Sequence, residues 1–110
     1  MANTTLGLDE KVEAALSYLL FFVSGIIILI LEQKSSFVRF HAAQSTVTFI
    51  VLYLLYHFAA FFPGRWILTP LISALFVILW IVGMVKAYSG ELYKFPLLGD
   101  IAETLVGKLR

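Results

Sequence analysis

The sequence predicts an all-α membrane protein: a bundle of three transmembrane helices, followed by a short C-terminal amphipathic helix at the membrane interface. Of its 110 residues, 61% are apolar and 14% are charged, and the mean hydropathy is +0.95. Soluble domains average about 45–50% apolar and about 25% charged residues. Three stretches, 14–31, 40–64 and 66–85, carry no charged side chain over 18, 25 and 20 residues. Each is long enough to cross a hydrocarbon core of about 30 Å as a helix.

The composition also excludes several classes of function. A net charge of +1 is too small to indicate a nucleic-acid partner. The absence of cysteine excludes disulfides, thiolate metal sites and a cysteine nucleophile. We therefore expect one integral membrane domain over residues 1–110, with the lipid bilayer as its surroundings, no metal and no cofactor.

The first span is expected near residues 10–32. Asp9 and Glu10 suit a helix N-terminus, where carboxylates satisfy free N–H groups and oppose the helix dipole. A secretory signal peptide would begin with positive charge and end at a small-residue cleavage site. Here acidic residues come first and the run ends at Leu31 and Glu32, so we expect the segment to be retained as a membrane helix.

The second and third spans are expected near residues 38–62 and 67–88. Between them, Pro63 and Gly64 suit the central positions of a type II turn. Thr69 and Pro70 could then be the N-cap and first residue of the third helix, because proline at that position loses no helical hydrogen bond. The alternative is a helix that begins at Arg65 and is kinked by Pro70.

The orientation follows from the basic residues, because lysine and arginine near span ends stay cytoplasmic. With three spans, Lys11 and Arg65 share one side of the membrane, and the other six basic residues share the opposite side. This predicts a multi-pass protein of the cell (plasma) membrane, with the N-terminus outside and the C-terminus in the cytoplasm.

The densest polar cluster opens the second span and consists of Arg39, His41, Gln44, Ser45 and Thr48. His41, Ser45 and Thr48 stand at positions i, i+4 and i+7, and Gln44 lies four residues before Thr48, so these side chains share one helical stripe. Such a stripe should face protein or water rather than lipid. It could line a groove for a substrate or a partner helix. The favoured alternative is interhelical hydrogen bonding, at about 0.6 kcal/mol per bond.

Signals for catalysis are weak. His57 lies in the second span, but none of the three uncharged stretches contains the aspartate or glutamate that a proton relay recruits. Serines such as Ser17, Ser24 and Ser73 have no nucleophile elbow around them. We therefore expect no catalytic residue and no enzymatic activity. Gly83 and Ala87 form a small-residue pair that favours close helix packing.

The tail resembles a short amphipathic helix over residues 100–110. Proline at 96 should end any preceding helix, and Asp100 and Glu103 have the spacing of a capping box. An apolar face follows, made of Ile101, Ala102, Leu105, Val106 and Leu109. This face could anchor the tail to the bilayer, or serve as a docking element for a partner.

Two stretches also carry a family resemblance, which extends from about Asp9 onward. They are Arg-Phe-His-Ala-Ala-Gln-Ser at 39–45 and Pro-Leu-Leu-Gly-Asp-Ile-Ala-Glu at 96–103, in which Pro96, Gly99, Asp100 and Glu103 stand out. The sequence resembles a prokaryotic family of small membrane proteins of unknown function. That family is grouped with the chloroplast inner-envelope import component, in the Tic-twenty-like superfamily. The resemblance implies a helical bundle in a cell membrane, and plant relatives that contribute to a preprotein channel.

Two functions follow from these patterns. The lack of catalytic and metal-ligating groups favours a non-enzymatic scaffold or accessory subunit of a membrane complex. The alternative is an oligomeric component of a protein or solute translocation pathway, as the resemblance suggests. Transport would require oligomers or another subunit, since three helices cannot enclose a pore as wide as a polypeptide. The expected partners are therefore the lipid bilayer and either further copies of this chain, as a homo-oligomer, or a partner membrane protein.

Overall fold

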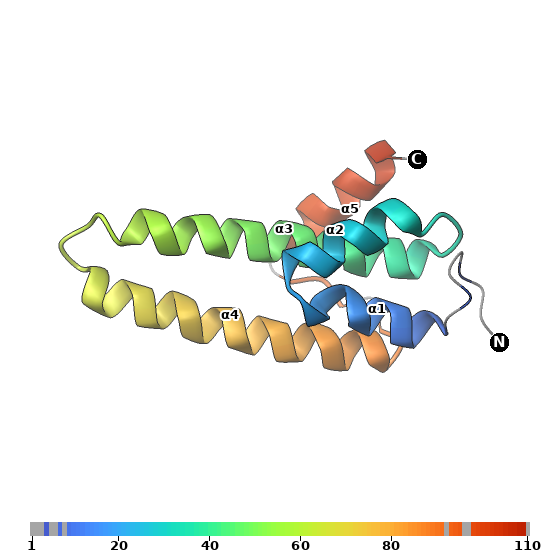
Figure 1. The fold of residues 1–110 in the computed structure, drawn as a ribbon, viewed down its shortest axis with the longest axis horizontal. Coiled ribbons are helices and arrows are strands. Elements are labelled where there is room, and N and C mark those ends of the chain that lie inside the picture. The colour runs from blue at the N-terminus through green and yellow to red at the C-terminus, as the bar shows by residue number, and fades with distance from the viewer. Residues whose placement is uncertain (1–3, 5–6, 8, 92, 96–97, 110) are drawn as a thin grey trace.

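The computed structural model contains five helices along a body of 51 × 26 × 20 Å (Figure 1). It describes residues 4, 7, 9–91, 93–95 and 98–109, and these contain no β-strand. The helices are α1 (Glu10–Leu19), α2 (Phe22–Leu31), α3 (Ser36–Ala59), α4 (Arg65–Tyr88) and α5 (Leu98–Leu109). In the described part of the chain, α3 and α4 are long and apolar enough to cross a membrane.

The two long helices form an antiparallel pair that is closed by a short turn at Pro63 and Gly64 (Figure 1). Each has 24 residues and extends about 36 Å. The third predicted span begins earlier than the favoured prediction, because α4 starts at Arg65 and includes Pro70. Pro70 has no backbone N–H, so the carbonyl of Trp66 loses its helical donor. The neighbouring Thr69 hydroxyl donates to a different carbonyl, that of Arg65, at 2.7 Å.

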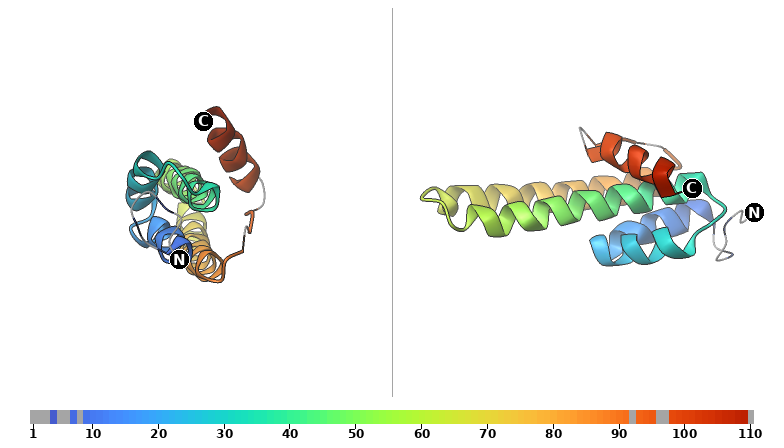
Figure 2. Two further views of the ribbon diagram at one scale, coloured as in Figure 1. Left: turned by 90° about the vertical axis from the view of Figure 1, so that its right-hand side faces the viewer. Right: turned by 90° about the horizontal axis from the view of Figure 1, so that it is seen from above.

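The segment predicted as one span over residues 10–32 differs from that prediction. It forms two ten-residue helices, α1 and α2, which fold back on each other (Figures 1 and 2). Ten residues of helix extend only about 15 Å, which is half of a hydrocarbon core. The α1–α2 hairpin therefore covers part of the length of α3, and the three-span arrangement becomes two long helices plus a short hairpin.

The break in this hairpin occurs at Phe21, whose φ of 60° lies in the left-handed region. Such a conformation costs about 1–3 kcal/mol in a residue other than glycine and needs support from its surroundings. Ser24 supplies part of it, since its hydroxyl accepts from the N–H of Leu20 and donates to the carbonyl of Ser17, both at 3.0 Å. The Phe21 ring packs on Phe49, Phe76 and Trp80, with centroids 4.7–5.5 Å apart.

The core lies around the first half of α3, with α1, α2 and α5 packed against it. Half of the most apolar stretch of α3 is buried, against 6% of the corresponding stretch of α4. Tyr18, Phe49 and Phe95 are the largest apolar side chains in this core, each at most 1% exposed. The second half of α3 and most of α4 expose apolar side chains, as expected of helices that face lipid.

The hairpin also changes where the chain ends lie. The start of α1, the α2–α3 loop and the end of α4 all lie at the end of the molecule opposite the α3–α4 turn (Figure 1). A single span over 10–32 would have put the start of α1 beside that turn. In the structure, the N-terminal helix therefore starts on the same side as the C-terminal elements.

Candidate functional site

The polar stripe predicted on the second span lies in the buried first half of α3. His41, Gln44, Ser45 and Thr48 are each 0% exposed. Ser35 begins the helix as its N-cap, and its hydroxyl accepts from the N–H of Val38 at 3.2 Å. The stripe thus faces protein, and the contacts of each side chain indicate what it does.

Gln44 connects α3 to α1 and to the segment before α5. Its side-chain N–H groups donate to the Tyr18 hydroxyl and to the Tyr93 carbonyl, both at 2.9 Å. Its side-chain carbonyl accepts from the N–H of Phe95 at 2.9 Å. One amide therefore satisfies two backbone groups of an irregular segment that lies about fifty residues later in the chain.

His41 completes this cluster. Its Nδ1 lies 2.8 Å from the Tyr18 hydroxyl, and its Nε2 lies 2.7 Å from the carbonyl of Glu91. A ring nitrogen that faces a carbonyl must donate, so Nε2 carries the proton and Nδ1 accepts from Tyr18 in the neutral ring. Both nitrogens are then engaged within the protein, which leaves no free base.

Arg39 and Ser45 hold the α1–α2 hairpin at two points. The Arg39 guanidinium donates to the carbonyl of Glu32 at 2.6 Å and to that of Leu29 at 3.4 Å, so it caps the C-terminal end of α2. The Ser45 hydroxyl donates to the carbonyl of Phe21 at 2.9 Å, at the break itself. Arg39 therefore binds carbonyls at the C-terminal end of α2, where helical donors run out. The Phe21 carbonyl also accepts from the N–H of Gly25 at 3.3 Å, so Ser45 adds a second donor to it.

Two buried polar atoms of the long helices have no hydrogen-bond partner among the described residues. They are the hydroxyl of Thr48 and the indole nitrogen of Trp80. Thr48 is the one member of the predicted stripe whose polar group makes no contact of this kind. The other four members bind backbone or side-chain groups of the protein.

Glycines permit the close packing of this region. A Cβ on Gly83 would lie 2.6 Å from the Tyr18 ring, and a Cβ on Gly25 would lie 2.8 Å from the Thr46 hydroxyl. Gly83 therefore brings α4 onto α1, while Gly25 brings α2 onto α3. Ala87, the second member of the predicted small pair, is 0% exposed one turn beyond Gly83.

The tail helix begins two residues earlier than predicted, so Asp100 lies in its first turn rather than at the N-cap. Asp100 and Glu103 instead face Lys94, at 3.9 and 3.0 Å from its Nζ. The hydrogen bond with Glu103 raises the pKa of Lys94. Gly99 lies so close to Lys94 that a Cβ would be 2.6 Å away. Pro96 lies outside the described residues.

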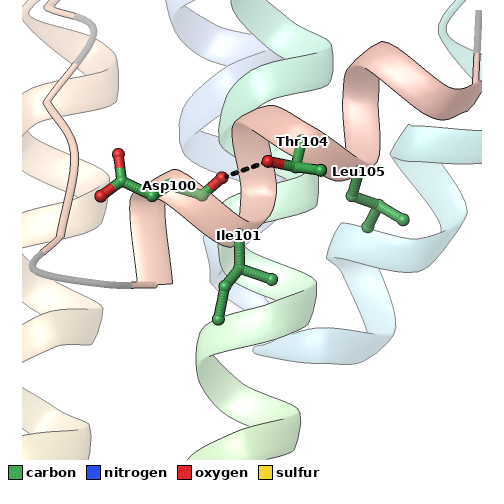
Figure 3. A pocket seen from close by; sticks show the side chains of 4 residues that line it. All are labelled: Asp100, Ile101, Thr104 and Leu105. Carbon is green, nitrogen blue, oxygen red and sulfur yellow. Dashed lines mark hydrogen bonds between the residues drawn. The ribbon is translucent and has the colours of Figure 1, made fainter.

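One face of α5 packs on the bundle, through Ala102 and Val106. Beside it an open groove of about 390 Å³ is lined by Asp100, Ile101, Thr104 and Leu105. Figure 3 shows Ile101 and Leu105 pointing from α5 toward the neighbouring helices. Ile101 is 51% exposed, so it lies at the edge of the face that the sequence predicted to be buried.

The remaining candidate groups lack catalytic geometry in the described residues. The Ser17 hydroxyl donates to the carbonyl of Ala14 at 2.5 Å, within its own helix. His57 is exposed, and its ring packs on those of Tyr53 and Tyr56. Among the residues whose positions are described, no group of three histidine, cysteine or acidic side chains could hold a metal ion.

Sequence reasoning missed one polar cluster, at the open end of the hairpin. Glu13 and Glu32 are both 0% exposed where the start of α1 meets the end of α2. Burial raises the pKa of Glu13 to about 7, and the nearby Glu32 carboxyl contributes to this rise. No pattern in the sequence joins these two residues, because the hairpin that brings them together was predicted as one straight helix.

Comparison with known proteins gives consistent results. Residues 9–102 match the model of the magnetosome magnetite crystal formation protein family. A UPF0132 membrane protein of Methanocaldococcus jannaschii is 52% identical over 89% of this chain and 71% of its own length. A second one from that organism is 50% identical over 94% of both chains.

A further relative, a UPF0132 membrane protein of Archaeoglobus fulgidus, is 44% identical over 91% of this chain and 98% of its own length. No solved structure matches. The matches agree with the predicted resemblance to a small prokaryotic membrane protein family. The grouping with the chloroplast import component stays a prediction.

Proposed function

The chain belongs to the magnetosome magnetite crystal formation protein family of small prokaryotic membrane proteins, and on that premise we propose that it is a non-enzymatic scaffold or accessory subunit of a membrane complex. The relatives at about half identity are named only as membrane proteins.

The observation that supports a scaffold is how the buried polar side chains are used. Arg39, His41, Gln44 and Ser45 all bind groups of the protein itself, at the end of α2, at the break and along residues 91–95. Hydrogen bonds of this kind fix one arrangement of irregular segments, because a buried backbone group without a partner is costly. A site that binds a transported or reacting molecule would need some of these groups free.

The proposed topology has two spanning helices, α3 and α4, with the α1–α2 hairpin dipping into the membrane from one side. Large apolar side chains on α2 favour insertion, since Ile27 and Ile30 are 49% and 65% exposed. Arg65 is the one described basic residue beside the α3–α4 turn. Five others belong to elements at the opposite end of the molecule (Figure 1): Lys11 in the first turns of α1, Lys34 in the α2–α3 loop, Arg39 in the first turns of α3, Lys86 in the last turn of α4, and Lys94 just before α5.

This distribution favours a cytoplasmic location for the start of α1, the α2–α3 loop and α5, in the cell membrane. The charge bias becomes more one-sided than with three spans, because Lys11 joins the larger group. The α3–α4 turn then faces outward. An outward N-terminus, which three spans required, is replaced in this proposal by an inward one.

The alternative function is an oligomeric component of a translocation pathway, which the predicted resemblance to the chloroplast import component favours. Two spanning helices and a short hairpin cannot enclose a polypeptide within one protomer. Transport would therefore need several copies or another subunit. A measurement of flux through the purified protein in liposomes therefore distinguishes a translocation component from a scaffold.

The experiment compares purified protein in liposomes with protein purified from native membranes in mild detergent. A scaffold predicts no ion or solute flux from liposomes and recovery of a partner in fixed stoichiometry. The partner should be lost when Val106→Asp displaces α5, and retained in the control Thr69→Val, a half-buried position in the first turns of α4. Reproducible flux that depends on protein density would contradict the scaffold and support the translocation role.

A further inference from the structure

The α1–α2 hairpin covers the two long helices over only part of their length. Figure 1 shows α3 and α4 continuing past the tip of the hairpin toward their own turn. Between these two helices lies an open groove of about 230 Å³. Seven residues line it: Leu52, Tyr53, Tyr56, Ile72, Ser73, Phe76 and Val77.

Two ring contacts place this groove directly beyond the hairpin tip. Phe21, at the break between α1 and α2, packs on Phe76 with the ring centroids 4.7 Å apart. Phe22, the first residue of α2, packs on Tyr53 with the centroids 5.9 Å apart. Because Phe76 and Tyr53 both line the groove, its inner end lies against the tip. The hairpin and the groove therefore follow each other along one face of the α3–α4 pair.

The polarity of this face changes between its two ends. Near the tip it is apolar, with Ile72 and Phe76 on α4. Arg65 lies seven residues before Ile72, so both side chains project from the same face of α4, two turns apart. Arg65 is exposed, and α3, α4 and the turn between them contain no acidic residue that could pair with it. An occupant with an apolar chain and an anionic head would match both ends.

The hairpin limits how long that occupant can be. A spanning helix of a partner protein needs about 20 residues and about 30 Å, so on this face it would meet the hairpin tip. The chains of a lipid in one leaflet cross only half of the hydrocarbon core, about 15 Å. Arg65 and Phe76 are eleven residues apart on α4, which corresponds to about 16 Å of helix. The face beyond the tip therefore has the length of one leaflet.

We propose that the groove binds one hydrocarbon chain of a phospholipid in the leaflet that contains the α3–α4 turn, with the phosphate of that lipid at Arg65. The chain lies between α3 and α4 and ends at the hairpin tip, while the guanidinium donates charge-assisted hydrogen bonds to the phosphate. This goes beyond the scaffold function, because it assigns a lipid ligand to the chain. It requires that α3 and α4 span the membrane, and it does not require a partner protein.

The test uses the fluorescence of the two tryptophans in the chain. Trp80 lies one turn beyond Phe76, and its ring packs on Phe21 with the centroids 5.5 Å apart. Trp66→Phe leaves Trp80 as the single tryptophan. Purified Trp66→Phe protein in detergent micelles is titrated with phosphatidylglycerol that carries bromine near the chain ends, because bromine quenches tryptophan on contact. We expect quenching that saturates at one lipid per protein.

Matched substitutions in the Trp66→Phe background separate the groove from general contact with lipid. Ser73→Phe fills the groove and should abolish the saturable quenching, whereas Ala74→Phe adds the same ring at an exposed position outside the groove lining and should keep it. Arg65→Gln should weaken the apparent affinity about tenfold, through the lost charge-assisted bonds to phosphate. Lys34→Gln removes a cation at the opposite end of the molecule and should leave the affinity unchanged.

Four results would overturn the proposal. Quenching that rises in proportion to the lipid without saturating would mean contact with bulk lipid only, and this result does not depend on the folding of a groove variant. The second is saturable quenching that persists in Ser73→Phe or is lost equally in Ala74→Phe, and the third is an affinity that Arg65→Gln leaves unchanged. The fourth is a dimer, seen by native mass spectrometry, that Ser73→Phe abolishes and Ala74→Phe keeps, because a protein helix would then fill the groove.

Discussion

Replacing Gln44 with leucine should destabilise the protein and release the segment before α5. The leucine side chain has a similar volume, but the substitution removes all three hydrogen bonds of the amide, to Tyr18, Tyr93 and Phe95. The three partners differ in burial and in their remaining hydrogen bonds, so the lost free energy of unfolding can be estimated for each partner separately.

The largest loss falls on the N–H of Phe95, a residue that is 1% exposed and is left without its acceptor. An unsatisfied buried donor costs about 1–3 kcal/mol. The Tyr18 hydroxyl keeps His41 as a partner, and the Tyr93 carbonyl belongs to an exposed residue that water can reach. These two losses should add about 0.5 kcal/mol each, close to the average for interhelical bonds in membranes. We therefore expect the free energy of unfolding to fall by about 2–4 kcal/mol.

Two measurements check this expectation. Reversible unfolding in mixed micelles gives the free energy of unfolding, and hydrogen exchange reports protection of residues 93–95 and α5. Thr69→Val is the matched control, because the half-buried Thr69 bonds only within its own helix in the described structure, and its loss should change stability by less than about 0.5 kcal/mol. If Gln44→Leu is as stable as this control and leaves exchange in α5 unchanged, the polar stripe does not hold the tail.

Two further substitutions test packing. Gly83→Val should lower the free energy of unfolding by about 1–3 kcal/mol, because its Cβ would lie 2.6 Å from the Tyr18 ring. In the same unfolding assay the control Gly107→Ala, whose Cβ meets no atom within 4 Å, should be neutral or slightly stabilising. Equal effects of the two substitutions would refute the assigned α1–α4 contact. Val106→Asp places a charge at a position on α5 that is 6% exposed, so it should abolish the protection of α5 from hydrogen exchange. The control Glu103→Gln, at an exposed position, should reduce that protection only slightly. Full protection in Val106→Asp would show that α5 is not docked through this face.

The long helices could be predicted from the sequence because the length of an uncharged run is a direct measure of what can cross a bilayer. The second predicted span, 38–62, differs by only a few residues from α3 (Ser36–Ala59). The start of α4 was harder to predict. Thr69 and Pro70 satisfy the rules for a helix start, yet five further residues continue the helix on the side of Arg65.

The hairpin could not be predicted in this way, because the break at Phe21 contains neither glycine nor proline. Its left-handed conformation depends on tertiary contacts, the bond from Ser45 to its carbonyl and the packing of its ring on α3 and α4. Ser24 was visible in the sequence as a polar residue within an apolar run. Isolated serines are common in membrane helices, so this signal has little weight by itself.

The polar stripe illustrates the same division. Helical spacing predicted that His41, Gln44 and Ser45 share one face of the helix, and in the structure that face is buried. The hydrogen-bond partners of these residues could not be predicted from spacing, because Gln44 binds Phe95, which lies 51 positions later in the chain. Likewise, the spacing of Asp100 and Glu103 resembles a capping box, but both acids are used to bind Lys94.

The most direct test of the hairpin and its topology is the side of the membrane from which α1 can be reached. Single cysteines at Lys11, Gln33 and Phe61, all exposed, are treated with a membrane-impermeant thiol reagent in right-side-out and inverted vesicles. A hairpin predicts that Lys11→Cys and Gln33→Cys react in the same vesicles, the inverted ones, while Phe61→Cys reacts only in right-side-out vesicles. Reaction of Lys11→Cys together with Phe61→Cys, and opposite to Gln33→Cys, would mean that residues 10–32 cross the membrane and would contradict the hairpin.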